Sequence, residues 1–273
     1  MKKKFSVFKL AARASFIKIL GLMGITFMVQ CILFAIAAAR VSNWEEDCKS
    51  LTVVLNISGM PFAALFCFLF ICILLVLPWT DAFGSIPKNT LYKLNVSGKQ
   101  AAVRIMIYNF CCFVILWGMQ LCTYLLCSLI YLNIAEAVNP SLQIFFAARN
   151  QFYFHNLLPL GDSFRIIVNI AGLFLAAAGT TCAAFTRTAK QKDFPYWQFL
   201  TVLCSFTVII SFITPAMTLP TAIFEAAFYF ALGCAYIIII MAACAIKFEP
   251  GKNINRKSRL KKRNLSESDP IIH

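Results

Sequence analysis

Acidic residues and histidines are scarce in this chain of 273 residues. It contains only 11 aspartates and glutamates, and its two histidines are His155 and the terminal His273. Metal sites and acid–base catalysis depend largely on these side chains. The sequence places no nucleophile or carboxylate beside His155. We therefore expect no catalytic residue, no resident metal and no cofactor.

The chain also lacks the phosphate-binding loop of an ATPase. The pattern G-x-x-x-x-G-K-[ST], whose backbone amides cradle phosphates, does not occur in it. Its polar segments are also far shorter than the roughly 100 residues of a typical domain. We expect that the chain is not an enzyme and that any ATP hydrolysis would reside in a separate subunit.

A disulfide framework is not expected, although the chain has 12 cysteines. All of them except Cys48 lie inside apolar runs, and no pair has the C-x-x-C spacing of many zinc sites. Buried cysteine behaves as a small hydrophobic residue. The cysteines therefore predict packing, and neither redox chemistry nor metal binding.

Long apolar runs are what the sequence has in abundance. Each is close to the length of about 20 residues that a helix needs to cross about 30 Å of hydrocarbon. A helix satisfies its own backbone in lipid, so each run predicts a transmembrane helix. The predicted fold is all-α, a polytopic membrane protein with six transmembrane helices. The runs are Phe16–Ala39, Pro61–Trp79, Ile105–Leu132, Ser163–Phe185, Gln198–Met217 and Phe224–Ile246.

The basic residues predict the orientation of these helices. Of the 25 lysines and arginines, only Arg40, Lys49, Arg149 and Arg165 fall on one side of the six-span arrangement. All others lie in the N-terminus, the loops after the second and fourth spans, and the C-terminus. The positive-inside rule places that side in the cytoplasm. We expect a multi-pass protein of the plasma membrane with both termini cytoplasmic.

Three regions are expected. Residues 1–15 interleave apolar and basic side chains, which predicts an amphipathic helix lying at the membrane interface, with a simple basic anchor as the alternative. Residues 16–246 form the six-helix domain. Residues 247–273 are a basic tail too polar to order itself, and it is expected to contact anionic lipids. No basic soluble domain suggests nucleic-acid binding.

The loop between the second and third spans is predicted to carry a short amphipathic element. Apolar side chains alternate with lysines between Pro87 and Gly98. Such an element could dock a cytoplasmic partner, and an ordinary basic loop is the alternative. The residues proposed to contact the partner are Lys88, Leu91, Tyr92, Lys93, Leu94 and Val96.

This loop resembles the coupling segment of one transporter family. The stretch Thr90-Leu-Tyr-Lys-Leu-Asn-Val-Ser97 is similar to the Thr-Leu-x-x-Leu-Pro-[Ile/Val]-[Ser/Thr] segment of permease subunits in type-2 ABC (ATP-binding-cassette) exporters, with Asn95 in place of proline. That family has an interfacial N-terminal helix and six spans with both termini inside. The resemblance implies a bacterial permease that works with a separate ABC ATPase, as a homodimer or as a heterodimer with a similar permease chain.

The predicted outer loops differ in character. The first, from Arg40 to Met60, is short and acidic, and it is expected to be a solvated turn. The second, from Asn133 to Asp162, is rich in aromatic residues, which favour the membrane interface. It is expected to form an outer gate. The gate residues are Phe152, Tyr153, Phe154 and His155.

The function expected from these features is that of the membrane-spanning permease subunit of an ATP-driven ABC exporter. The spans contain mostly neutral polar residues, which disfavours a proton relay or an ion path of charged groups. The alternative is a non-transporting membrane scaffold or an immunity-type membrane protein. An intramembrane enzyme is disfavoured because no embedded catalytic set is present.

Overall fold

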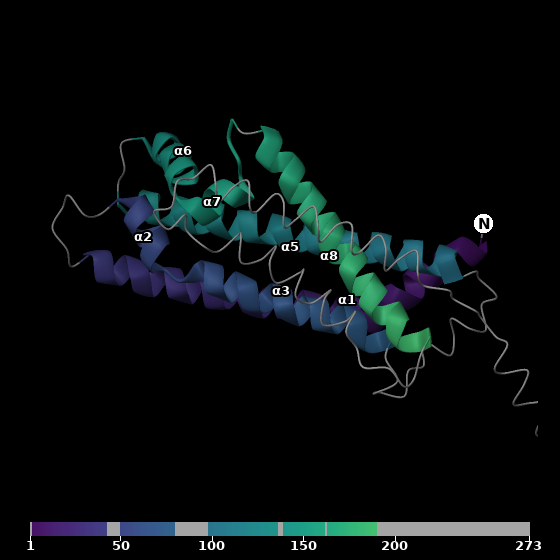
Figure 1. Cartoon of the computed structure of the whole chain (residues 1–273). Helices are drawn as coiled ribbons and strands as arrows, with labels where there is room; N and C mark the ends of the chain where they lie inside the picture. Colours follow the sequence, from purple (N-terminus) through teal and green to yellow (C-terminus); the bar gives the residue numbers. More distant parts are fainter. Residues whose placement is uncertain (1, 43–49, 80–97, 136–138, 162, 190–273) are drawn as a thin grey trace, which may run out of the picture.

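The computed structural model describes residues 2–42, 50–79, 98–135, 139–161 and 163–189. Every element within these residues is helical (Figure 1). This confirms the all-α prediction for the described part of the chain. The elements are α1 (Lys2–Ser42), α2 (Leu51–Ile57), α3 (Met60–Val76), the 3-10 turn η2 (Leu77–Trp79), α5 (Gly98–Ile134), α6 (Pro140–Asn150), α7 (Phe152–Leu157) and α8 (Ser163–Ala189).

Three of these helices are long and apolar enough to cross a membrane. They are the segments Val7–Val41, Met60–Trp79 and Gln100–Ile134. They coincide with the first three predicted spans. At about 1.5 Å per residue, α1 and α5 are each more than 50 Å long, so both extend beyond a hydrocarbon core of about 30 Å. These helices make the chain a membrane protein by length and composition.

The remaining predicted spans are not established in the same way. Helix α8 (Ser163–Ala189) covers the fourth one, and the segment Asn169–Cys182 within it is apolar. The fifth and sixth, Gln198–Met217 and Phe224–Ile246, and the C-terminal tail lie outside the described residues. The count of six spans and the cytoplasmic placement of the termini stay predictions.

The N-terminal segment is continuous with the first spanning helix. Helix α1 runs unbroken through 41 residues, so residues 2–15 continue directly into the first spanning helix. Part of their apolar face is also used inside the molecule, because Val7 and Ala11 are buried against residues of η2 and α5. An in-plane orientation at the membrane surface remains a prediction for this segment.

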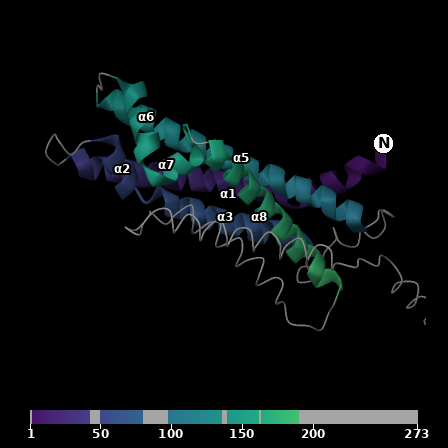
Figure 2. The ribbon, with the colours of Figure 1, turned by 45° about the horizontal axis from the view of Figure 1, so that its top comes forward.

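Helices α1, α3, α5 and α8 form the body of the molecule. Helices α1, α3 and α5 run side by side, and α8 crosses them obliquely (Figures 1 and 2). The short helices α2, α6 and α7 gather at the end of the bundle opposite the N-terminus, which we call the distal end (Figure 1). By the charge pattern, the distal end is the predicted outer end.

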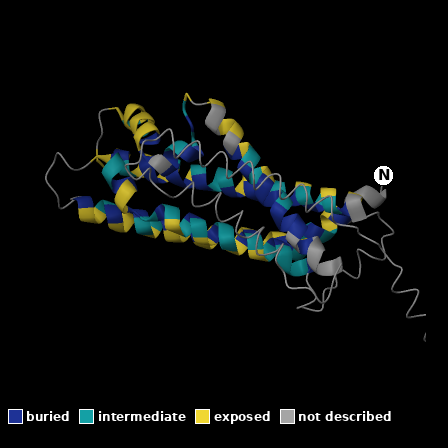
Figure 3. Ribbon diagram, viewed as in Figure 1, coloured by how far each residue is buried: buried dark blue, intermediate teal, exposed yellow. Residues whose placement is uncertain are grey.

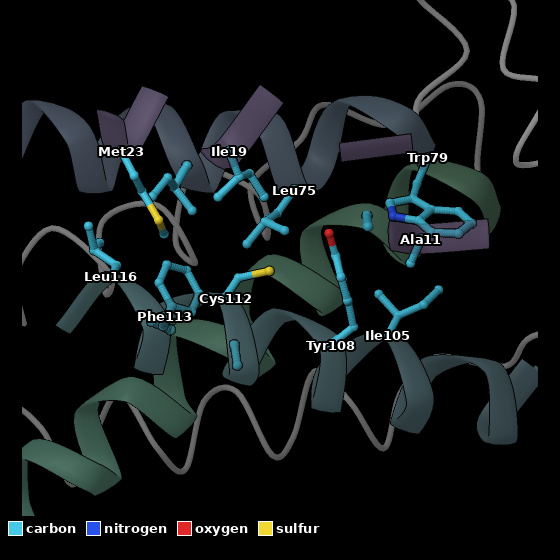
Figure 4. Close-up of a cluster of buried hydrophobic side chains, with 14 of the residues drawn as sticks. Ala11, Ile19, Met23, Leu75, Trp79, Ile105, Tyr108, Cys112, Phe113 and Leu116 are labelled. Carbon is cyan, nitrogen blue, oxygen red and sulfur yellow. The ribbon is translucent and has the colours of Figure 1, made fainter. Parts of the chain in front are cut away.

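Two hydrophobic clusters fill the bundle along its length. The first core cluster contains buried residues of α1 up to Met23, of α3 and η2 from Cys67, and of α5 up to Leu116, with alanines of α8 (Figure 4). The second core cluster lies toward the distal end. It contains Phe34 and later residues of α1, Tyr124 and later residues of α5, and buried residues of α2, α3, α6 and α7.

The opposite faces of the long helices are exposed (Figure 3), and they carry many large apolar side chains. On α3 the exposed side chains are Phe62, Phe66, Phe70 and Ile73, each more than half accessible. Their spacing of three or four residues places them on one face, which suits contact with lipid tails. Buried Ala64, Cys67, Ile71 and Leu75 occupy the other face.

The first predicted outer loop is not simply a solvated turn. Residues Leu51–Ile57 form α2, whose Leu51, Val54 and Leu55 side chains are buried in the second core cluster. Gly59, in the left-handed region at φ 66°, then reverses the chain into α3. The apolar residues Leu51, Val54 and Leu55 are spaced so that they lie on one side of α2, and this side packs against the bundle. The acidic residues 45–47 lie outside the described residues.

Candidate functional site

The proposed coupling segment, Lys88 to Val96, lies outside the described residues. The two elements that bracket it are described. Trp79, at the end of η2, and Ala101, near the start of α5, are both buried in the first core cluster. Val7 and Ala11 of α1 lie in the same cluster (Figure 4 labels Ala11 and Trp79). The connection between α3 and α5 therefore leaves and re-enters the bundle at its N-terminal end.

The predicted gate residues lie in α7 at the distal end. Phe152 begins this helix, and the side-chain oxygen of Gln151 caps it by accepting a hydrogen bond from the backbone N–H of Phe154. Tyr153 and Phe154 are buried, and His155 is half-buried. Burial raises the pKa of the Tyr153 hydroxyl above its ordinary value, so this group is neutral at physiological pH.

Tyr153 and Phe154 pack against α5. The ring of Tyr124 has its centroid 5.3 Å from that of Tyr153 and 5.6 Å from that of Phe154. A further contact fixes α7 to α8, because the Nδ2 of Asn169 donates to the backbone carbonyl of Asn156 over 2.6 Å. The predicted gate is thus a helix seated on the bundle. Its gating role is not tested by this arrangement.

A pair of buried glutamines lies between the two core clusters along α1 and α5. Gln30 Nε2 donates to Gln120 Oε1 over 2.6 Å and to the backbone carbonyl of Met60 over 3.1 Å. Both side chains are almost fully buried. The pair joins α1, α3 and α5 within the spanning segments, where polar side chains gain from finding partners.

Two more polar contacts join helices nearer the N-terminal end. Asn109 Nδ2 of α5 donates to Thr180 Oγ1 and Thr181 Oγ1 of α8, at 3.0 and 3.1 Å. The hydroxyls of Ser15 on α1 and Tyr108 on α5 are 2.9 Å apart. These contacts tie α5 to α1 and to α8 with neutral groups.

Carboxylates are absent from all of these contacts for a simple reason. The described residues contain no aspartate or glutamate, since all 11 acids fall in the other parts of the sequence. The described part of the chain also holds no cluster of three or more histidine, cysteine or acidic side chains that could bind a metal. Chemically, the described bundle can offer hydrogen bonds, aromatic surface and thiols.

Sequence reasoning found these polar residues only in part. Gln30, Gln120 and the two threonines stand out as neutral polar residues inside apolar runs, but the sequence alone assigned them no role. Asn109, Ser15 and Tyr124 were missed. Helical spacing could have identified Tyr124 as a buried residue. Gln120 and Tyr124 are four residues apart on α5 and share a face with buried Leu116.

Comparison of the chain with protein-family models, with curated proteins and with solved structures finds no match.

Proposed function

We propose that this chain is the membrane-spanning permease subunit of an ATP-driven exporter of the ABC type, working with a separate ATPase chain. The observation that carries the proposal is the combination of spanning helices with an interior free of carboxylates in the described bundle. Transport driven by protons or sodium usually relies on titratable or ion-binding groups near the membrane midplane. Without such groups in the described helices, an external source of energy is favoured.

The helix ends that bracket the coupling segment support the choice of partner. Trp79 and Ala101 are buried near the N-terminal end of the bundle, where α1 carries Lys9, Arg13 and Lys18 on its exposed surface. By the positive-inside rule this is the cytoplasmic end. An ATPase docking there would push on α3 and α5 directly, because both helices continue from the segment.

A dimer is part of the proposal. The interior of the described bundle is occupied by two hydrophobic clusters, so a wide path through one resting chain is not favoured. The complete transporter would contain two copies of this chain, or this chain with a similar permease, and would contact anionic lipids through its basic end. It would act in a bacterial plasma membrane with both termini cytoplasmic.

The filled interior also favours a second candidate. A non-transporting membrane scaffold, or an immunity-type protein that protects a membrane, needs no path for a solute. The two functions differ in their partner, since only the permease requires a chain with a phosphate-binding loop.

Co-purification tests the proposal. We expect the tagged chain, extracted in a mild detergent from its own cells, to bring down one chain with a Walker phosphate loop and to form an ATP-hydrolysing complex. The triple variant Leu91→Asp, Tyr92→Asp and Leu94→Asp should lose that chain but still insert in the membrane, because added carboxylates disrupt an apolar docking surface.

The matched control places the same charge change on the same predicted side. In the variant Leu260→Asp, Leu265→Asp and Ile271→Asp, three aspartates are added to the tail, and the complex should be retained. Recovery of the intact chain without any ATPase would favour the scaffold. Equal loss in both variants would remove the coupling role of residues 88–96.

A further inference from the structure

Four polar side chains of α5 form a row along one face of the helix. They are Trp117, Gln120, Tyr124 and Ser128, and we call them the polar row. Successive members are three or four residues apart, so they fall within an arc of about 80° around the helix. The row spans about 16 Å at 1.5 Å per residue, which is roughly half of the hydrocarbon thickness.

Most polar atoms of this row lack a hydrogen-bond partner. The indole nitrogen of Trp117 and the hydroxyls of Tyr124 and Ser128 are buried and make no hydrogen bond within the described structure. Tyr124 and Ser128 are completely inaccessible. Buried polar groups in proteins are nearly always hydrogen-bonded, so three unpaired groups in one row require an explanation.

The glutamine pair extends the row onto α1. Gln120 binds Gln30, and the Oε1 atom of Gln30 is again buried without a partner among the described residues. Toward the N-terminal end the hydroxyls behave differently, because that of Tyr108 is paired with Ser15 at 2.9 Å. Unpaired hydroxyls on α5 are thus found in its distal half.

Helix α7 covers the distal part of the row. The rings of Tyr153 and Phe154 pack on Tyr124, and α7 follows α6 after one extended residue, Gln151. It contacts α5 through ring packing, and Asn169 of α8 donates a hydrogen bond to its backbone. A helix of only six residues held in this way can move without unfolding a spanning helix.

We propose that the polar row lines the distal half of a solute path and that Tyr153 and Phe154 of α7 are its plug. The inference deepens the proposed transport function and rests on it. The solute class that fits is an uncharged molecule with several hydrogen-bonding groups. Neutral donors and acceptors line the row, whereas a charge would be costly there without a counter-charge. When α7 moves, water or solute satisfies the unpaired atoms.

Thiol labelling from the distal side tests the plug. We place Ser128→Cys in the full chain in vesicles and follow labelling by an uncharged, hydroxyl-bearing methanethiosulfonate, with each cysteine read separately by peptide mass spectrometry. Cys122, exposed on another face of the same helix, is the internal control. Adding Phe154→Ala should increase the labelling rate at position 128 about tenfold, which is equivalent to about 1.4 kcal/mol of lost packing. The labelling rate of Cys122 should not change.

The same experiment tests the solute class. A sulfonate-bearing reagent of similar size should label position 128 more slowly than the uncharged reagent, after correction for their rates with a free thiol. Equal acceleration at Cys122 would mean general loosening of the fold, and an unchanged rate at position 128 would mean that α7 is not the plug. Either result would overturn the proposal.

A second measurement needs no substitution. Hydroxyl-radical footprinting modifies buried side chains that contact water, so Tyr124 should be modified at least several-fold faster than Tyr108, although both are buried. Equal, low modification of the two tyrosines would overturn the hydrated row. Both measurements use this chain alone, so the absence of an ATPase partner would refute the proposed function and leave these results standing.

Discussion

Single polar residues inside the bundle contribute more to which helices pack together than to the free energy of unfolding. Cross-helix hydrogen bonds in membranes are worth roughly 0.6 kcal/mol on average, because polar groups find other partners when the helices separate. Asn109 is an example. Thr180 and Thr181, to which it donates, also bond to backbone carbonyls of Ala176 and Ala177 on their own helix. Loss of Asn109 would therefore leave both hydroxyls satisfied.

This reasoning predicts a small effect for Asn109→Leu. The variant loses two hydrogen bonds but also removes the buried, unpaired Oδ1 atom of Asn109, so its free energy of unfolding should change by less than about 1 kcal/mol. Phe113→Ala should cost roughly 2 kcal/mol or more, because Phe113 is fully buried and stacks on Phe68 with centroids 5.0 Å apart.

Unfolding in mixed micelles measures both values. Val114→Ala is the control, since this side chain is exposed on the lipid face and its loss should fall within about 0.5 kcal/mol. A larger loss for Asn109→Leu than for Phe113→Ala would contradict this order and make the Asn109 contact the dominant link between α5 and α8.

At the scale of helices, the sequence predicted the long apolar helices, which depend on composition. It missed the short helices, which depend on tertiary contacts. The first three spans were found because long apolar runs have no alternative in lipid. Helix α2 was missed because seven residues are too few to form a stable helix alone, and burial of Val54 and Leu55 stabilises it. The same applies to α7, whose cap at Gln151 and packing on Tyr124 have no sequence signature.

The end of the third span was easier to place. A proline at position 140 predicts that the helix of the third span does not continue through it, and α5 ends at Ile134, before Pro140 begins α6. Proline at the first turn of a helix is favoured because its missing N–H has no helical partner there. Local backbone chemistry therefore favours the start of α6 at Pro140, whereas the packing of α6 and α7 on the bundle depends on the folded context.

The pairing of α1 with α5 can be tested through two native cysteines. Cys31 of α1 and Cys127 of α5 have their sulfur atoms 4.0 Å apart. A small membrane-permeant oxidant such as iodine should join them, because a modest movement brings the sulfurs to bonding distance of about 2 Å. The iodine is reduced to iodide as the two thiols lose their protons and form the disulfide.

Mass spectrometry of linked peptides gives the readout. A peptide of α1 should be joined to one of α5 through these two cysteines, and Cys31→Ser should abolish the product. Cys111 and Cys122, which are exposed on α5, provide the comparison. A dominant link from Cys31 to either of them would show that α5 presents another face to α1.

At the scale of the whole molecule, the charge distribution predicts which end of the bundle faces the cytoplasm. The exposed basic residues Lys9, Arg13 and Lys18 lie on the N-terminal half of α1, and α2, α6 and α7 lie at the other end. Basic residues are concentrated in the N-terminus, two loops and the tail of the sequence, and this pattern predicts an even total number of spans.

Reporter fusions test this orientation. Alkaline phosphatase, which is active only outside the cytoplasm, should be active when fused after position 135 and inactive after positions 195 and 273, whereas a fluorescent protein should give the reverse pattern. The reason is that lysines and arginines near span ends resist translocation. Phosphatase activity at position 273 with an intact chain would require an odd number of spans. It would also place the basic tail away from the anionic cytoplasmic leaflet, against the electrostatic preference of its lysines and arginines.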